Sequence, residues 1–145
     1  METCSYLSFE LGKEYFASSV SNVINIVDLL QITKVPNAPR HMMGVINLRG
    51  DVLPLIDTRI KLGVEESEFC NETCILVLNV VQDGESVHVG AIVDSVHEVF
   101  DVTDETILKP TSVGTTVKYN YITGMVENNG NFIMILDMDK LFAFN

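Results

Sequence analysis

The stretch Gly44-Val-Ile-Asn-Leu-Arg-Gly-Asp-Val-Leu-Pro-Leu-Ile-Asp-Thr-Arg-Ile-Lys-Leu-Gly63 carries two short apolar runs on either side of a tight polar turn. The runs 45–48 and 52–56 predict two strands. Arg49-Gly50 predicts the turn that joins them, because glycine accepts the positive φ that a two-residue hairpin turn requires. The stretch therefore predicts a β-hairpin.

The end of the same stretch predicts a short helix over 58–62. Asp57 is a residue type that caps helix N-termini, and Gly63 suits the left-handed position after the last turn. Asp57-Thr58 also begins the Asp-Thr-Gly of aspartic proteases. However, Arg59 stands in place of the glycine, and the second carboxylate would have to come from another copy of the chain. We therefore expect Asp57 to be a helix cap.

Arg49-Gly50-Asp51 has the form of a cell-adhesion triplet, which needs an exposed extracellular loop. The cysteines Cys4, Cys70 and Cys74 are odd in number, and no secretory signal is visible at the N-terminus. Both features favour a reducing cytoplasm. No apolar run reaches the roughly 20 residues of a membrane helix. We therefore expect a cytoplasmic protein with no direct membrane insertion, in which the triplet is a turn.

Strand and turn patterns dominate the rest of the chain. Further strands are predicted over 5–11, 14–17, 22–27, 74–81, 87–93, 96–102, 121–127 and 131–136, with hairpin turns at Gly12-Lys13, Asp83-Gly84 and 128–131. Asp137 predicts the N-cap of a last helix over 138–142. Many short strands with hairpin signals favour an all-β barrel fold. Two small barrels packed together would use the loop 104–118 as a joint.

The charge of the chain is strongly negative and unevenly distributed. The net charge is −11, residues 1–63 sum to zero, and residues 64–145 hold 14 acids against three bases. Such a chain repels phosphate backbones, so we expect no nucleic-acid partner. Every arginine lies between Arg40 and Arg59, and arginine is enriched at protein interfaces. A protein partner reached through this segment is therefore expected.

The sequence gives little support for catalysis or for a bound metal. His41, His88 and His97 lack metal-ligand spacing, and Cys70-x-x-x-Cys74 lacks a second pair or a nearby histidine. No nucleophile stands beside a base, and the glycines fall at turns. We expect no enzyme, no catalytic residue, no metal site and no cofactor.

Arg59 is unusual for its place in the first turn of the expected helix. A cation there faces the positive end of the helix dipole, which costs about 0.3–1 kcal/mol when exposed. Asp57 or Asp51 could offset that cost. Two interpretations remain open: a solvated surface arginine, or an arginine that acts with Arg49 on a shared acidic target.

Several motifs, in order along nearly the whole chain, resemble a known family. They are Gly44-x-x-Asn-Leu-Arg-Gly-x-Val-x-Pro-x-x-Asp-x-Arg59, the opening hairpin 7–16, Val93-Asp94-x-Val96-x-Glu-Val99, Pro110, Tyr121-Ile-Thr-Gly124 and Ile135-Leu-Asp-Met-Asp-Lys-Leu141. They are similar to the motifs of CheW chemotaxis coupling proteins and of the CheW-like domains of chemotaxis kinases.

The resemblance implies an all-β fold of two small SH3-like five-stranded β-barrels packed together, with short helices that include one at the C-terminus. It implies a single CheW-like domain over 5–145, built of two intertwined barrel subdomains. It also implies a non-catalytic cytoplasmic adaptor, recruited to receptor arrays at the inner membrane. The implied partners are the regulatory domain of a CheA-type histidine kinase and the cytoplasmic helical hairpin tip of chemoreceptors, the methyl-accepting chemotaxis proteins.

Site residues are carried over from the resemblance position by position. The receptor groove between the barrels would take Val23, Asn25, Asn47, Arg49, Gly50 and Arg59, and the kinase-binding side would take Val87 and Val89. The family often has glutamate where this chain has Asn25, leucine where it has Thr58 and glycine where it has Ser95. The loss of a carboxylate at Asn25 leaves an alternative open, a scaffold of the same fold in a non-motility chemosensory-like pathway.

Overall fold

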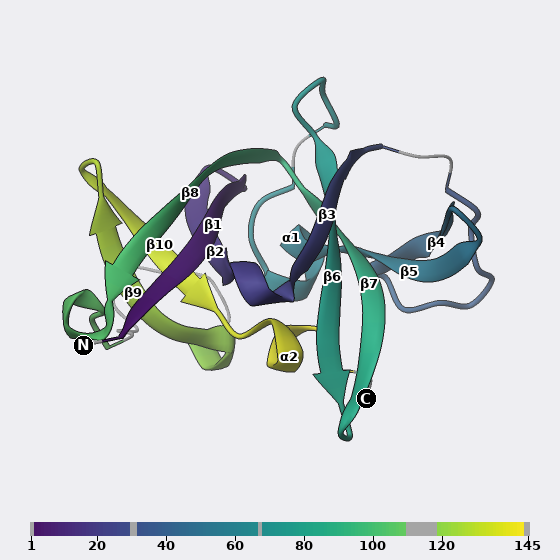
Figure 1. Cartoon of the computed structure of the whole chain (residues 1–145). Helices are drawn as coiled ribbons and strands as arrows, with labels where there is room; N and C mark the ends of the chain where they lie inside the picture. Colours follow the sequence, from purple (N-terminus) through teal and green to yellow (C-terminus); the bar gives the residue numbers. More distant parts are fainter. Residues whose placement is uncertain (1, 30–31, 67, 110–118, 144–145) are drawn as a thin grey trace.

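The computed structural model describes residues 2–29, 32–66, 68–109 and 119–143, which form two curved five-stranded sheets side by side (Figure 1). The sheet that holds the first and last strands of the chain is called the terminal sheet here. Its order is β8-β1-β2-β10-β9. The bounds are β1 (Thr3–Leu11), β2 (Glu14–Ser19), β8 (Ser95–Thr103), β9 (Ile122–Asn128) and β10 (Asn131–Leu136).

The second sheet comes from the middle of the chain and is called the middle sheet. Its order is β3-β6-β7-β5-β4, with β3 (Val23–Asp28), β4 (Met42–Leu48), β5 (Asp51–Asp57), β6 (Cys74–Gln82) and β7 (Glu85–Val93). Each sheet has one parallel contact, β10 with β2 and β5 with β7, among antiparallel ones. In neither sheet does the described hydrogen-bonded order return to its first strand, so the expected barrels are open, curved sheets.

The predicted hairpin turns are confirmed, and their backbone explains the residues found there. Four turns carry two successive positive φ angles, at Gly12 (57°) and Lys13 (76°), Arg49 (53°) and Gly50 (87°), Asp83 (51°) and Gly84 (81°), and Asn129 (53°) and Gly130 (82°). Turns of this hand match the right-handed twist of the strands that they join. Each turn therefore fixes the register of its hairpin.

Both predicted helices are confirmed, with their caps. The Asp57 side chain accepts the Arg59 amide at the start of α1 (Thr58–Leu62), and Gly63 has φ 76°. The Asp137 side chain accepts the Lys140 amide at the start of α2 (Met138–Leu141). No helix among the described residues is long and apolar enough to cross a bilayer.

The chain crosses between the sheets at places that the sequence did not indicate. One crossing is the 3-10 turn Val20–Asn22 between β2 and β3, and the other is Asp94 between β7 and β8. The expected joint, 104–118, is wrong in this respect, since it joins β8 to β9 within the terminal sheet. Pro110 and the rest of that loop, 110–118, lie outside the described residues.

One apolar core serves both sheets. It contains Phe9 and Phe16 from the terminal sheet, Leu76 from the middle sheet, Leu62 from α1 and Leu141 from α2, all fully buried. Because the core is continuous across the junction, the relative position of the two sheets is set by packing.

Candidate binding groove

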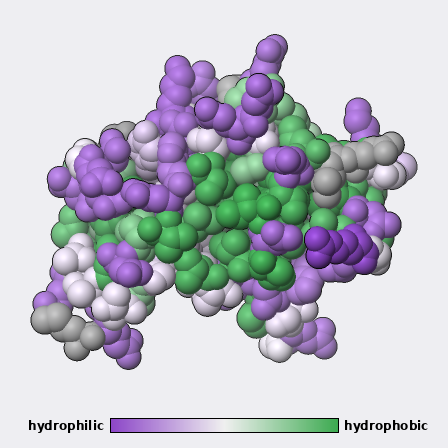
Figure 2. Space-filling view, turned by 45° about the horizontal axis from the view of Figure 1, so that its top comes forward, coloured by the Kyte–Doolittle hydropathy of each residue, from purple (hydrophilic) through white to green (hydrophobic). Residues whose placement is uncertain are grey.

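A groove runs between the edge strands of the two sheets. β3 is an edge of the middle sheet and β8 is an edge of the terminal sheet. The groove has a volume of about 460 Å³ and is lined by Ile26, Asp28, Glu72, Cys74, Ser95, Val96 and His97. Figure 2 shows hydrophobic surface gathered in the middle of the molecule, with hydrophilic residues toward its ends.

β3 exposes apolar side chains at this edge. Val23 and Val27 pack toward the cores, whereas Ile24 is 51% exposed and Ile26 is 44% exposed. Alternate residues of a strand share a face, so Asp28 continues the row of Ile24 and Ile26. Because Ile26 lines the groove, an exposed apolar side chain is available there for contact with another protein.

Asn25 has a local role in this strand. Its Oδ1 accepts the amide of Ile26 at 2.9 Å, beside a register shift between Val23 and Asn25 in the pairing with β6. An amide engaged in this way is not available to an added strand, and a bulge disturbs the edge further. The edge is therefore better suited to contact by side chains than to strand addition.

The floor of the groove is polar and well connected. Ser95 is buried, and its hydroxyl donates to Glu10 at 3.3 Å and lies 3.4 Å from Nε2 of His97. The His97 ring is exposed to the groove and lies 5.3 Å from the Tyr15 ring. Burial, and then the charge of Asp28, raise the pKa of the Cys74 thiol, which therefore stays protonated and unreactive at neutral pH.

Arg59 lies in a buried ion-pair network at the start of α1. Its side chain is 3% exposed, with Nε and Nη2 each 3.0 Å from Asp57 and Nη1 3.1 Å from Asp94. The hydrogen bonds to Asp57 raise the pKa of Arg59 above its ordinary value, against the opposing effect of burial. The solvated surface arginine, one of the two interpretations that the sequence left open, is therefore wrong. Asp57 offsets the charge of Arg59 as expected, and the second acidic partner is Asp94 instead of Asp51.

The network joins segments of both sheets. Asp94 accepts the amide of Gly12 at 2.7 Å, in the β1–β2 turn, and also pairs with Arg59 of α1. The ring of Phe69 lies 5.3 Å from the Arg59 guanidinium carbon. Arg59 thus ties the middle sheet to the terminal sheet through Asp94.

The described residues present no metal-binding cluster. No group of three or more His, Cys, Asp or Glu side chains is placed to hold an ion within 2–29, 32–66, 68–109 and 119–143. His88 pairs with Asp51 at 3.0 Å, on an exposed face. The arrangement offers contact surface and fixed charge, as a binding protein requires.

Comparison with known proteins places this geometry in a family. The model of the CheW-like domain matches residues 5–144. The chain belongs to the CheW-like domain family. It is 32% identical over 138 residues to a chemotaxis protein CheW of Klebsiella aerogenes, covering 95% of this chain and 81% of that protein. It is 32% identical over 136 residues to a chemotaxis protein CheW of Thermotoga maritima, covering 93% and 85%.

A solved structure shares the fold over the full chain. The scaffolding protein TtCheW from Thermoanaerobacter tengcongensis matches with a TM-score of 0.86 at 28% identity, covering 100% of this chain and 91% of that one. The CheW family is a family of chemotaxis scaffolds, and this chain has its two-sheet architecture.

The six residues predicted for the receptor groove lie in three separate places of this CheW-like domain. Val23 and Asn25 are on β3, beside the groove. The turn that holds Asn47, Arg49 and Gly50 is exposed at the β4–β5 end of the middle sheet, the edge opposite β3, and Asn47 Oδ1 accepts the Gly50 amide at 2.9 Å. Arg59 is buried in its ion pairs with Asp57 and Asp94 and does not line the groove. Their contact with a receptor stays a prediction.

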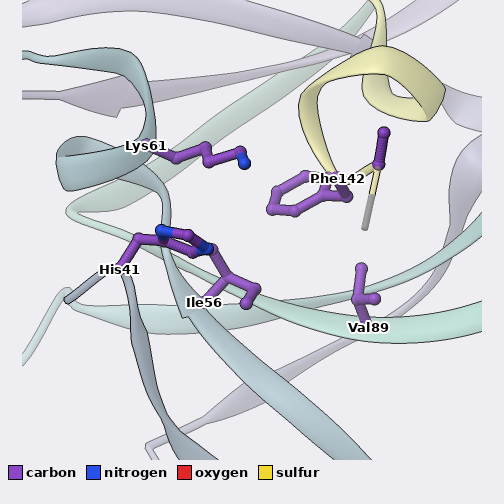
Figure 3. Close-up of a pocket in the computed structure, with 6 residues that line it drawn as sticks. His41, Ile56, Lys61, Val89 and Phe142 are labelled. Carbon is purple, nitrogen blue, oxygen red and sulfur yellow. The ribbon is translucent and has the colours of Figure 1, made fainter. Parts of the chain in front are cut away.

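The two residues predicted for kinase binding lie on β7, inside the middle sheet. Val89 is fully buried, and in Figure 3 its side chain points toward Phe142, beside a small cavity also lined by Ile56. Val87 is half-buried. Val89 supports the core, and kinase contact through this strand stays a prediction that rests on Val87.

Sequence reasoning missed Ile26, Asp28 and Glu72 as groove residues. The run 23–27 carried a signal, because apolar residues occupy both alternating faces of the expected strand, with Asn25 as the exception. Such a run indicates a strand in contact on two faces. On an edge strand the second face has no cover within the chain.

Proposed function

We propose that this CheW-like domain is a non-catalytic cytoplasmic adaptor that couples chemoreceptors to a CheA-type histidine kinase, at receptor arrays on the inner membrane. Membership of a family of chemotaxis scaffolds supports this role. The observation that carries it is the groove between β3 and β8, which is lined by the exposed Ile26, with the exposed Ile24 two residues before it on the same strand.

The physical argument starts from those isoleucines. Full burial of an isoleucine side chain is favourable by about 1.5–3 kcal/mol, and half of each side chain remains open to a partner. A receptor's helical hairpin tip would lay an apolar stripe along Ile24 and Ile26, in the manner of a helix in a groove. The groove closes no reaction chamber, and its function is contact.

An adaptor needs a second surface for its second partner. The half-buried Val87, the accessible one of the two residues proposed for kinase binding, lies on β7, inside the middle sheet and away from its β3 edge. A kinase regulatory domain docked there would leave the groove free. The two partners could then bind at the same time, which coupling requires.

Co-elution on a sizing column tests both contacts. The full chain is mixed with the regulatory domain of a CheA-type kinase, and separately with the cytoplasmic fragment of a chemoreceptor from the same genome. Ile26→Glu is expected to abolish co-elution with the receptor fragment and to retain the kinase domain. Leu108→Glu, at a residue 54% exposed, is the matched control and retains both. Parent protein that binds neither partner at tens of micromolar excludes the proposal.

Asn25 favours the alternative of a non-motility chemosensory-like scaffold, because the receptor-facing carboxylate common in the family is absent. Asn25→Glu removes the side-chain bond to the Ile26 amide and restores that charge. Unchanged affinity for chemotaxis receptors after this substitution would show that the position is neutral and would remove the support for the alternative.

A further inference from the structure

We propose that the groove selects a partner helix that carries a lysine or arginine beside its apolar stripe, and that Asp28 and Glu72 are the residues that select it. The inference rests on the proposed function, since it specifies the receptor surface that the groove accepts. Asn25 is uncharged, so the negative charge that selects the partner comes from Asp28 and Glu72.

The position of the two carboxylates is the first ground. Asp28 ends the row of Ile24 and Ile26 on β3, and Glu72 lies two residues before Cys74, which pairs with Asp28 in the sheet, so both carboxylates line the same side of the groove. Both side chains are exposed. A helix seated on β3 would therefore have two negative charges beside one end of it.

The second ground is that these charges lack an internal counter-charge. Among the described residues, neither Asp28 nor Glu72 makes a hydrogen bond or an ion pair, whereas Asp57, Asp94 and Glu66 all do. The groove lining includes no lysine or arginine. A cationic side chain of the partner supplies the positive counter-charge to Asp28 and Glu72. The net charge of −11 attracts such a partner from a distance.

The third ground is that the edge of β3 disfavours an added strand. The Ile26 amide is already bonded to Asn25, and the pairing with β6 is bulged. The groove then recognises its partner through side-chain contacts, as a hydrophobic groove recognises an amphipathic helix. Apolar residues determine the fit, and the flanking cation determines the choice among receptors.

The test uses the full chain and the cytoplasmic fragment of a methyl-accepting chemotaxis protein from the same genome, with calorimetry at 50 and 300 mM NaCl. The double variant Asp28→Asn/Glu72→Gln is expected to weaken binding roughly 3–10-fold at low salt, the sum of two partly exposed ion pairs. The difference from the parent shrinks at high salt. The control pair Glu85→Gln/Glu127→Gln removes two exposed carboxylates elsewhere and is expected to change affinity less than twofold.

Charge reversal locates the partner residue. Asp28→Lys is expected to reduce affinity further, and a lysine- or arginine-to-glutamate change in the receptor tip is expected to restore it. If Ile26→Ala weakens binding but the carboxylate variants do not, the groove is the docking site and the charge requirement is wrong. If the parent does not bind the fragment at all, the proposed function itself fails. Unchanged melting temperatures exclude unfolding as the cause.

Discussion

At the scale of single residues, the buried Arg59 network changes what a substitution should do. Removal of one partner from a buried ion pair leaves an uncompensated charge, which costs more than the pair contributes when intact. Asp57 and Asp94 would both lose their cation. Arg59 therefore contributes first to the stability of the fold, and it affects partner binding only through the fold.

Arg59→Ala is expected to lower the free energy of unfolding by about 3–5 kcal/mol, measured by urea denaturation. Arg40→Ala is the control, because the Arg40–Glu66 pair is exposed and such pairs contribute about 0–1 kcal/mol. A stable Arg59→Ala protein with weakened receptor binding alone would instead place the guanidinium in the binding surface.

Glu14 gives a pH dependence of known sign. Burial raises the pKa of Glu14 above its ordinary value, so the folded chain holds this proton more tightly than the unfolded chain. The associated stability is fully present below the unfolded pKa and is lost as the pH rises through the folded pKa.

Glu14→Gln is therefore expected to be more stable than the parent at pH 7 and to lose that advantage near pH 4. Urea denaturation of both proteins at the two pH values measures the difference. An advantage of the same size at both pH values would assign it to something other than ionisation.

At the scale of elements, hairpin turns and helix caps were predictable because their signals are local. Asp57 and Asp137 act on amides two and three residues away, and the turn glycines act on their own backbone. The order of strands depends on partners far along the chain, such as β8 beside β1. For the same reason, the pairing of Arg59 with Asp94, 35 positions away, left no sign in the sequence.

The candidate site was predicted in part, and the same contrast explains the rest. Val23 and Asn25 lie on β3, beside the groove, and their contact with a receptor stays a prediction. Asn47, Arg49 and Gly50 lie elsewhere, because the strand order puts β4 at the edge of its sheet opposite β3. The exposure of Ile26 depends on which strand lies at an edge, which tertiary structure decides.

The β4–β5 turn supplies a prediction that separates backbone strain from packing. Gly50 has φ 87°, and a Cβ placed there would meet nothing within 4 Å. Gly50→Val is therefore expected to cost about 1–3 kcal/mol from the left-handed backbone alone, measured by the urea midpoint. Gly50→Asn should cost clearly less, because asparagine accepts this region. Equal losses for the two variants would contradict the strain explanation.

At the scale of the whole molecule, three connections hold the two sheets together. The first is the shared core. The second is the link from Arg59 through Asp94 to Gly12. The third is α2, which follows the terminal sheet but accepts the amide of Val81 on β6 through Asp139 at 2.8 Å. We infer from these connections that residues 5–145 behave as one domain of two intertwined subdomains.

Cooperative unfolding tests that inference, and the chain supplies a probe for each sheet. In a Tyr119→Phe background the remaining tyrosines, Tyr6, Tyr15 and Tyr121, lie in or beside the terminal sheet, so tyrosine fluorescence reports on it. In a Cys4→Ser/Cys70→Ser background, Cys74, buried at the start of β6, reports on the middle sheet through its reaction with a thiol reagent. Leu76→Ala creates a cavity in the middle sheet and is expected to cost about 2–5 kcal/mol. Because the core is shared, the urea midpoint of the tyrosine signal should fall together with that of Cys74 exposure. A tyrosine midpoint that stays at the parent value would mean that the sheets unfold separately, and the groove between them would then be a joint between two independent units.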